Sequence, residues 1–243
     1  MTYITNKDPQ LEIAQNKVAD KRHRALGGNN NFLNANKEES IWDQGGLLTI
    51  TDTNKTLYAS SSSSSDVGVN LVILGWDDNL ETAFRLVTTN GQNQVALNAD
   101  LAFISNVALL AGPEPQGDIY IAESDTLIGG VPQTQSKIQA KMIQGNNASY
   151  NAVDVASPGT TWFIRVIEYT TGKLNDIDIV INFKPLGESW IKFPLIHLSE
   201  SPIDISKDIY TRLIEKSIIL VNAISRDDGA ALSAGIFFDE VDN

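Results

Sequence analysis

The sequence contains no cysteine, and its 243 residues include only two histidines, His23 and His197. A chain without thiols forms no disulfide, no thiolate metal site and no cysteine nucleophile. Two histidines so far apart provide no His-x-x-x-His pair, which argues against a histidine-based zinc site. His197 could act in a Ser-His-Asp triad, but no Gly-x-Ser-x-Gly elbow supplies the serine, so we expect a structural histidine. These absences predict a protein without a cofactor.

Long apolar runs and phosphate-binding loops are missing as well. No apolar stretch approaches the roughly 18 residues that span a bilayer, and Met1–Asn6 do not begin a secretory signal. Neither Gly-x-Gly-x-x-Gly nor Gly-x-x-x-x-Gly-Lys-[Ser/Thr] occurs. We therefore expect no membrane partner and no nucleotide site.

Basic residues are scarce, and they are unevenly distributed. The chain has 18 Lys and Arg against 30 Asp and Glu, a net charge of −12, which argues against nucleic-acid binding. Residues 1–37 hold six basic and three acidic residues and carry +3, whereas residues 38–243 carry −15. This asymmetry predicts a basic N-terminal arm over 1–37 and an acidic body over 38–243.

The predicted arm has few large apolar residues and ends in a polar tract, Gly27–Asn31. It cannot bury enough surface to order itself, so it is expected to be extended or partly helical. A thin helical stripe is formed by Leu11, Ala14 and Val18. The basic residues predicted to bind an acidic partner are Lys17, Lys21, Arg22 and Arg24. The alternative is a disordered terminus without a partner; if the arm binds one, removal of 1–37 leaves a folded body that no longer assembles.

Alternating apolar residues dominate the body. Rows with period 2 occur over 67–73, 138–142, 162–166 and 177–183, and turn residues such as Asn90-Gly91 and Gly129-Gly130 separate them. This pattern predicts an all-β fold, an antiparallel, jelly-roll-like β-sandwich. The body is one sandwich or two packed β subdomains that divide near 112–117. The segment 206–215 reads equally well as a short helix or an irregular strand.

Several acidic pairs could support glycoside hydrolysis or calcium binding, and two tryptophans could stack on sugars. The pairs are Asp77/Asp78, Asp176/Asp178, Asp204/Asp208 and Asp227/Asp228, and the tryptophans are Trp42 and Trp76. Two of the pairs lie in turn sequences, where Asp is favoured for backbone reasons. The run Ser60–Ser65 is expected to be a flexible surface loop, with a binding loop as the alternative.

A series of motifs resembles one family, the virion structural proteins of tailed bacteriophages. Ser40–Gly46 resembles its Ile-Trp-Asp-x-Gly-Gly signature, after a basic tract and an Asn-containing spacer. Further matches in chain order include Ser61–Asp66, Val72–Asn79, Gly117–Ile121, Ile143–Ser149, Ala156–Thr161, Glu215–Ala223 and Leu232–Asp239. Trp76 replaces the usual Leu, and the match around Gly159 is imperfect. The resemblance covers about residues 20 to 243.

The resemblance implies a structural protein of the phage particle without enzymatic activity, made in the host bacterial cytoplasm. A capsid decoration or cement protein that binds the major capsid protein is the first hypothesis. Such a subunit is expected to be a homo-oligomer, and a trimer would match the threefold positions of a capsid surface. A neck, tail or head-fibre protein and a glycan-binding or glycan-cleaving β-sandwich are the alternatives. The motif positions expected to be structural are Trp42, Gly45, Gly46, Trp76, Asp77, Asn79 and Gly159.

Overall fold

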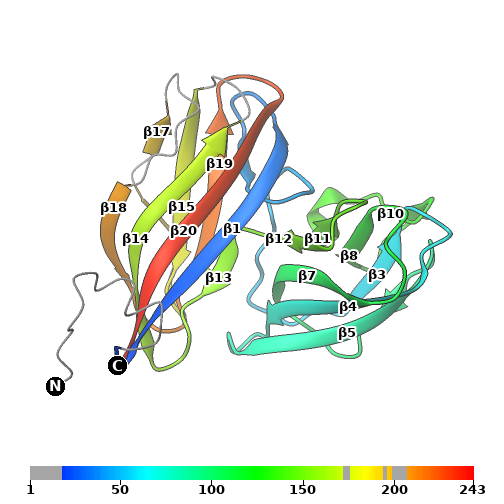
Figure 1. Ribbon diagram of the computed structural model, residues 1–243, viewed down its shortest axis with the longest axis horizontal. Coiled ribbons are helices and arrows are strands. Elements are labelled where there is room, and N and C mark those ends of the chain that lie inside the picture. The colour runs from blue at the N-terminus through cyan, green and yellow to red at the C-terminus, as the bar shows by residue number, and fades with distance from the viewer. Residues whose placement is uncertain (1–17, 172–175, 194–195, 199–206) are drawn as a thin grey trace.

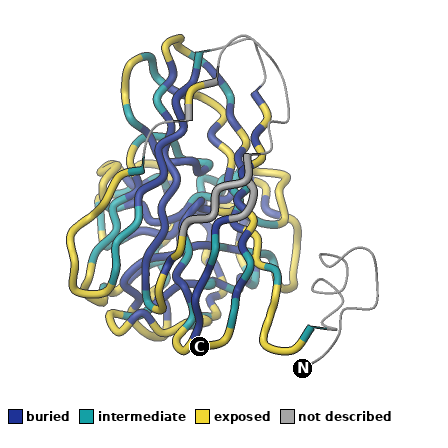
Figure 2. Tube along the Cα trace, turned by 90° about the vertical axis from the view of Figure 1, so that its left-hand side faces the viewer, coloured by how far each residue is buried: buried dark blue, intermediate teal, exposed yellow. Residues whose placement is uncertain are grey.

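The computed structural model describes residues 18–171, 176–193, 196–198 and 207–243. The described residues form antiparallel sheets and a single 3-10 turn, Gln135–Lys137, which confirms the all-β prediction. Two lobes stand side by side, and the chain passes from the first to the second and back (Figure 1). Buried residues run through the interior of the molecule, and the exposed residues lie toward its periphery (Figure 2).

The first lobe is a sandwich of two sheets. Its eight principal strands are β1 (Lys21–Leu33), β13 (Val153–Val155), β14 (Thr160–Thr171), β15 (Ile177–Lys184), β16 (Ile191–Lys192), β18 (Lys207–Leu213), β19 (Ile218–Ser225) and β20 (Ala230–Asp242). The sheets run β1-β20-β14-β18 and β13-β19-β15-β16, with β2 (Glu38–Ser40) on β19 and β17 (Ile196–Leu198) on β15. Numbered 1 to 8 along the chain, these strands follow the orders 1-8-3-6 and 2-7-4-5. That double order is the strand order of a jelly roll, as predicted.

The second lobe is a sandwich of the same kind. Its eight principal strands are β3 (Leu57–Ser61), β4 (Val67–Trp76), β5 (Thr82–Asn90), β6 (Val95–Ala96), β7 (Phe103–Ala111), β8 (Ile119–Glu123), β11 (Ile138–Met142) and β12 (Ala148–Tyr150). Its sheets run β11-β8-β3-β6 and β12-β7-β4-β5, and β9 (Leu127–Ile128) pairs with β10 (Val131–Pro132) as a hairpin. When these eight strands are numbered 1 to 8 along the chain, the two sheets have the orders 7-6-1-4 and 8-5-2-3. Adding two to each number, with 9 and 10 counted as 1 and 2, gives the jelly-roll orders of the first lobe. The second lobe therefore has the same winding, circularly permuted.

Each lobe has its own apolar core, and a third core joins them. The first sandwich packs Trp162 against Phe238, with ring centroids 5.0 Å apart. The second packs aliphatic residues of β4, β7 and β8. The junction core combines Val153 and Ile218 of the first lobe with Trp76 and Phe103 of the second. The body is thus two packed sandwiches.

The division of the body does not fall near 112–117, as the sequence suggested. β7 and β8, on either side of that segment, contribute to the same second core. The second lobe is inserted between β2 and β13, so the chain crosses between lobes before Leu57 and again after Tyr150. An insertion was not apparent in the sequence because the turn residues at the crossings resemble those between strands of one sheet.

The predicted boundary of the N-terminal arm at residue 37 is wrong. Residues 21–33 form β1, which pairs antiparallel with β20 from Lys21 opposite Val241 to Leu33 opposite Ala230. Leu26 and Leu33 are buried in the first core. The mostly polar sequence of β1 is ordered because a long partner strand satisfies its backbone groups. Residues 1–17 lie outside the described part of the chain.

The undecided segment 206–215 resolves as a strand. β18 spans Lys207–Leu213 and pairs with β14, so the helix-like spacing of Ile209, Tyr210 and Leu213 does not produce a helix. The predicted row 67–73 forms β4, with Val69, Leu71 and Ile73 buried and Val67 exposed. Among the described residues, no helix is long and apolar enough to span a bilayer.

Deletion of residues 1–37 is expected to unfold the first lobe, contrary to the expectation from sequence. The deletion removes a sheet strand with two fully or nearly buried leucines, Leu26 and Leu33. Deletion of residues 1–17 leaves every described strand in place and serves as the control. Thermal unfolding followed by circular dichroism should be cooperative for the shorter deletion and lost or strongly shifted for the longer one. Equal unfolding of the two variants would contradict this role of β1.

Candidate functional site

The Ile-Trp-Asp-x-Gly-Gly motif forms a tight loop at the junction of the lobes. Trp42 is fully buried, and its indole Nε1 donates a hydrogen bond to the carbonyl of Gly46 at 2.9 Å. Gly45 and Gly46 have φ of 75° and 70°, a region that disfavours side chains with a Cβ. Gln135 of the second lobe donates through Nε2 to the carbonyl of Gly45 at 2.7 Å. The motif therefore fastens the two lobes together.

Trp76 belongs to the same junction and is only 4% exposed. Its ring stacks on Phe103 with centroids 5.1 Å apart. A sugar-stacking platform needs an accessible ring face, which neither Trp42 nor Trp76 offers. The glycan site predicted on these tryptophans is therefore wrong, because both side chains are used to build the contact between lobes.

Asp77 and Asn79 form the turn between β4 and β5. The Asp77 carboxylate accepts hydrogen bonds from the backbone N–H groups of Asn79 and Glu81, both at 2.9 Å. Lys216, in the turn before β19, donates to the carbonyl of Asn79 at 3.1 Å and pairs with Glu81 at 2.9 Å. The Asp77 carboxylate therefore stabilises the turn, and the contacts of Lys216 with this turn link the two lobes.

The serine-rich run lies partly on a strand and partly in a surface loop. Its first two residues lie on β3, Ser64 and Ser65 are exposed, and Asp66 after the run is buried. The Asp66 carboxylate accepts from the backbone N–H groups of Gln116 and Gly117, at 2.7 and 3.0 Å, and from the Ser61 hydroxyl. The Asp66 carbonyl accepts from Thr89 and Gly91. Through its carboxylate and its carbonyl, Asp66 thus joins its own loop to the segments around Gly91 and Gly117 at one end of the second lobe.

The asparagine-containing tract and Gly159 have structural contacts too. Asn30, on β1, is buried and donates through Nδ2 to the carbonyl of Ser40 at 3.0 Å. Gly159 has φ of 73°, and its N–H donates to Glu215 at 2.6 Å, while its carbonyl accepts from the N–H of Asn243 at 2.9 Å. It therefore closes the turn before β14 against the last residue of the sequence.

Two of the basic residues predicted to bind a partner form ion pairs within the chain. Arg22 and Arg24 both reach Glu240, whose side chain is only 1% exposed, at 3.1 and 2.6 Å. Arg22 also pairs with Asp242, and the Arg24 guanidinium lies 5.9 Å from the centre of the Trp162 ring. A buried carboxylate needs such compensation. The basic residues Arg22 and Arg24 of the predicted arm therefore pair with acidic residues of the same molecule, at the end of β20.

The two remaining basic candidates stay predictions. Lys21 is exposed at the start of β1, and Lys17 lies outside the described residues. Within 1–17, Lys7 and Lys17 are balanced by Asp8 and Glu12. The positive charge assigned to the arm is therefore carried mainly by β1 and not by the segment before it.

Asp154 lies on β13 beside this ion-pair cluster. Burial raises the pKa of its carboxyl to about 7, and the negative charge of Glu240 acts in the same direction. The N–H of Val155, which donates to Asp154 at 2.7 Å, and the charge of Arg24 oppose the shift. Near neutral pH this carboxyl is therefore partly protonated.

Both histidines pair with aspartates on neighbouring strands. His23 on β1 contacts Asp239 on β20 at 2.8 Å. His197 on β17 contacts the buried Asp178 on β15 at 2.7 Å, and Arg226 binds the other oxygen of Asp178 at 2.9 Å. Because His197 and Arg226 each bind one oxygen of the Asp178 carboxylate, they compensate the buried negative charge of Asp178. Among the described residues, no three His, Asp or Glu side chains come together as a metal site.

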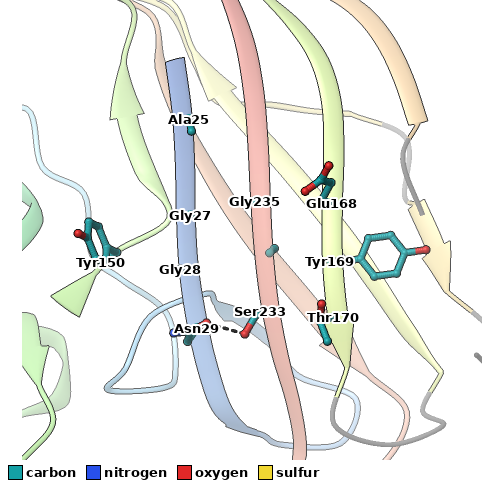
Figure 3. Close-up of a pocket in the computed structure, with 11 residues that line it drawn as sticks. Ala25, Gly27, Gly28, Asn29, Tyr150, Glu168, Tyr169, Thr170, Ser233 and Gly235 are labelled. Carbon is teal, nitrogen blue, oxygen red and sulfur yellow. Dashed lines mark hydrogen bonds between the residues drawn. The ribbon is translucent and has the colours of Figure 1, made fainter. Parts of the chain in front are cut away.

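A shallow groove of about 480 Å³ crosses the outer face of the sheet β1-β20-β14 (Figure 3). Its floor includes Gly27 and Gly235, its far side Glu168 and Thr170, and Tyr150 of the second lobe stands beside β1. Glycoside hydrolysis needs two carboxyl groups about 5 to 10 Å apart. Of the described residues that line the groove, only Glu168 carries a carboxylate. The groove therefore lacks the pair that this chemistry requires.

The structural role of most motif residues was predicted from the resemblance, whereas their shared location was not. Trp42, Gly45, Gly46, Trp76, Asp77 and Asn79 meet at the lobe junction. Gly159 lies elsewhere, at the turn before β14. Sequence reasoning missed Asp66 as an anchor and Glu240 as a buried charge; the six-residue Ser run before Asp66 was the only available signal for the first.

No protein-family model and no curated protein matches this chain. Among solved structures, it is similar to T=1 particles derived from infectious bursal virus, with 9% identity and a TM-score of 0.25, over 92% of this chain and 70% of that chain. It is also similar to the VP2 subviral particle of infectious bursal disease virus, with 9% identity and a TM-score of 0.22, over 92% and 72% of the two chains. Likenesses at this level carry no inference about function.

Replacing Asp66 by Ala is expected to destabilise the protein by about 3 kcal/mol, because the buried N–H of Gly117 and the partly buried N–H of Gln116 lose a charged acceptor. Asp78→Ala, at the exposed β4–β5 turn, is the matched control and should change stability by less than about 0.5 kcal/mol. Urea unfolding measures both. Equal stability of the two variants would show that Asp66 is not an anchor.

Asp154 is expected to make stability decline as the pH rises from about 4 to 7. Its folded pKa of about 7 exceeds the ordinary 3.8, so the folded state keeps a proton that the unfolded state releases in this window. Asp154→Asn should therefore flatten the loss of stability between about pH 4 and pH 7. Asp125→Asn is the control, since hydrogen bonds from Thr134 lower the pKa of Asp125 to about 2, outside that window. Identical slopes for wild type and Asp154→Asn would refute the assignment.

Proposed function

We propose that this protein is a non-enzymatic structural component of a bacteriophage particle, a decoration or cement subunit that binds the outside of the major capsid shell. It would be made in the cytoplasm of the host bacterium and incorporated into the virion. The observation that carries the proposal is the ordered series of motifs that resembles tailed-phage virion proteins across about residues 20 to 243.

The positions of these motifs in the fold support the proposal. Trp42 and Trp76 pack in the junction core, Asp66 joins its own loop to two other segments and Gly159 closes a turn. Residues that build an architecture are the ones expected to persist in a family whose function is structural. A resemblance based on such residues extends to the whole two-lobe body and not to an isolated site.

The physical character of the molecule also suits a particle component. Two jelly rolls joined by a common core form a stiff body, and a net charge of −12 favours solubility before assembly. Jelly rolls occur in viral capsids but also in lectins and cupins, so the fold alone does not choose among these functions. The glycan-binding alternative required an exposed Trp42 or Trp76 to stack on a sugar, and both side chains are buried.

The major capsid protein is the proposed partner, and neither nucleic acid nor membrane is needed. Residues 1–17, which precede the first described strand by only a few residues, remain the candidate segment for this contact, together with Lys21. Arg22 and Arg24 are left out because they already compensate Glu240.

Purified phage particles test the proposal through the copy number of the protein. Hundreds of copies per particle are expected for a capsid decoration protein, whereas a handful would place it at the neck or tail. Absence of the protein from washed particles would refute a virion role. The deletion of residues 1–17 should fold but fail to join particles; normal incorporation would refute the role of this segment alone.

A further inference from the structure

The outer face of the sheet β12-β7-β4-β5 is largely apolar, and in the described part of the chain its side chains Phe84 and Leu86 are exposed. This sheet is the layer of the second lobe away from β3 and β8 (Figure 1). The inner face packs the second core. An antiparallel sheet with one solvated face normally alternates apolar and polar residues, so an apolar outer face departs from the expected pattern.

Strand register shows which side chains share this outer face. One row across the sheet contains Phe84, Leu74, Asn106 and Tyr150, which lie opposite one another on β5, β4, β7 and β12. The next row contains Leu86, Val72, Ala108 and Ala148. Neither row includes a charged residue. Phe84 is 65% exposed and Leu86 57%, so the face is open to solvent.

The face has both a protrusion and a hollow. Beside the second row lies a groove of about 410 Å³, bordered by Leu86 and Leu110 and lined by Asn70, Thr88 and Ala111. Leu110 is 58% exposed and is the extra residue of a bulge opposite Asn70 and Leu71. Phe84 stands four residues from Thr88 on β5, about 13 Å along the strand. A surface that carries both features can complement a copy of itself across a twofold axis.

We infer that this face is a self-association surface, on which a second copy of the chain packs with its Phe84 ring directed at the groove beside Leu110. Charge favours this face over the rest of the surface as the contact between two copies: each copy carries −12, so two copies repel over most of their surfaces and approach most easily through an uncharged face. Contiguous apolar patches of this kind mark interaction sites.

The area of the face is close to what a specific dimer needs. Strands lie about 4.8 Å apart and rise about 3.3 Å per residue, so the 31 residues of these four strands offer roughly 490 Å² per copy. Two copies would bury roughly 980 Å², at the lower limit of roughly 1,000 Å² expected of a specific interface. The dimer should therefore be weak, with a dissociation constant on the order of micromolar.

Sedimentation of the purified full chain over concentrations on the order of 1 to 100 μM tests the inference. Wild type should pass from monomer to dimer, and Phe84→Asp should remain monomeric over the whole range. Leu110→Asp, on the groove side, should do the same and provides a second variant if one substitution perturbs folding. Ile128→Asp is the matched control, because Ile128 is 66% exposed but lies on the β9 hairpin.

A wild type that stays monomeric, a dimer unaffected by both face variants, or equal dissociation by Ile128→Asp would each overturn the inference. Loss of particle binding by Phe84→Asp in a monomeric protein would instead assign the face to the capsid protein and also overturn it. Since the sedimentation experiment contains no particle, its failure leaves the proposed virion role unchanged.

Discussion

The pairing of the first described strand with the last is the interaction on which the rest of the structure depends. β1 and β20 close one sheet of the first jelly roll, and they place Arg22 and Arg24 beside the buried carboxylate of Glu240. A buried charge without partners would be strongly unfavourable, so the basic stretch of β1 and the acidic end of β20 require each other. The second lobe is carried between β2 and β13, so its attachment depends on this closed sandwich.

The junction between the lobes explains why the motif residues are so diverse in chemistry. Trp42 contributes apolar area, Gly45 and Gly46 a backbone conformation, and Asp77 two acceptors for N–H groups. Each satisfies a different need of one contact between two sandwiches. A resemblance carried by such residues concerns architecture and does not by itself identify a binding or catalytic site.

The two sandwiches present unlike surfaces. The first lobe covers its sheets with charged and polar cross-strand pairs, such as His23 with Asp239. The second lobe leaves two uncharged rows on the outside of β4 and β5. Separation of these properties onto different lobes would allow contact through one face of the second lobe while the rest of the acidic surface remains repulsive.

Local patterns in the sequence determined the all-β class, the alternation of the strands and most turns, because period-2 alternation and residues such as Gly129-Gly130 act within a few neighbours, whereas the strand order of the two jelly rolls came only from the tertiary structure. The sequence also indicated that Trp42 and Asp77 are structural. Tertiary structure alone decided the order of β1, the insertion of the second lobe and the fate of Arg22, since a polar strand is ordered by a partner more than 200 residues away. The sequence is limited in the same way for Phe84. Alternation along β5 places Phe84 on the other face of the sheet from Arg85 and Val87, but only the packing of the sheets determines which of these faces is exposed to water.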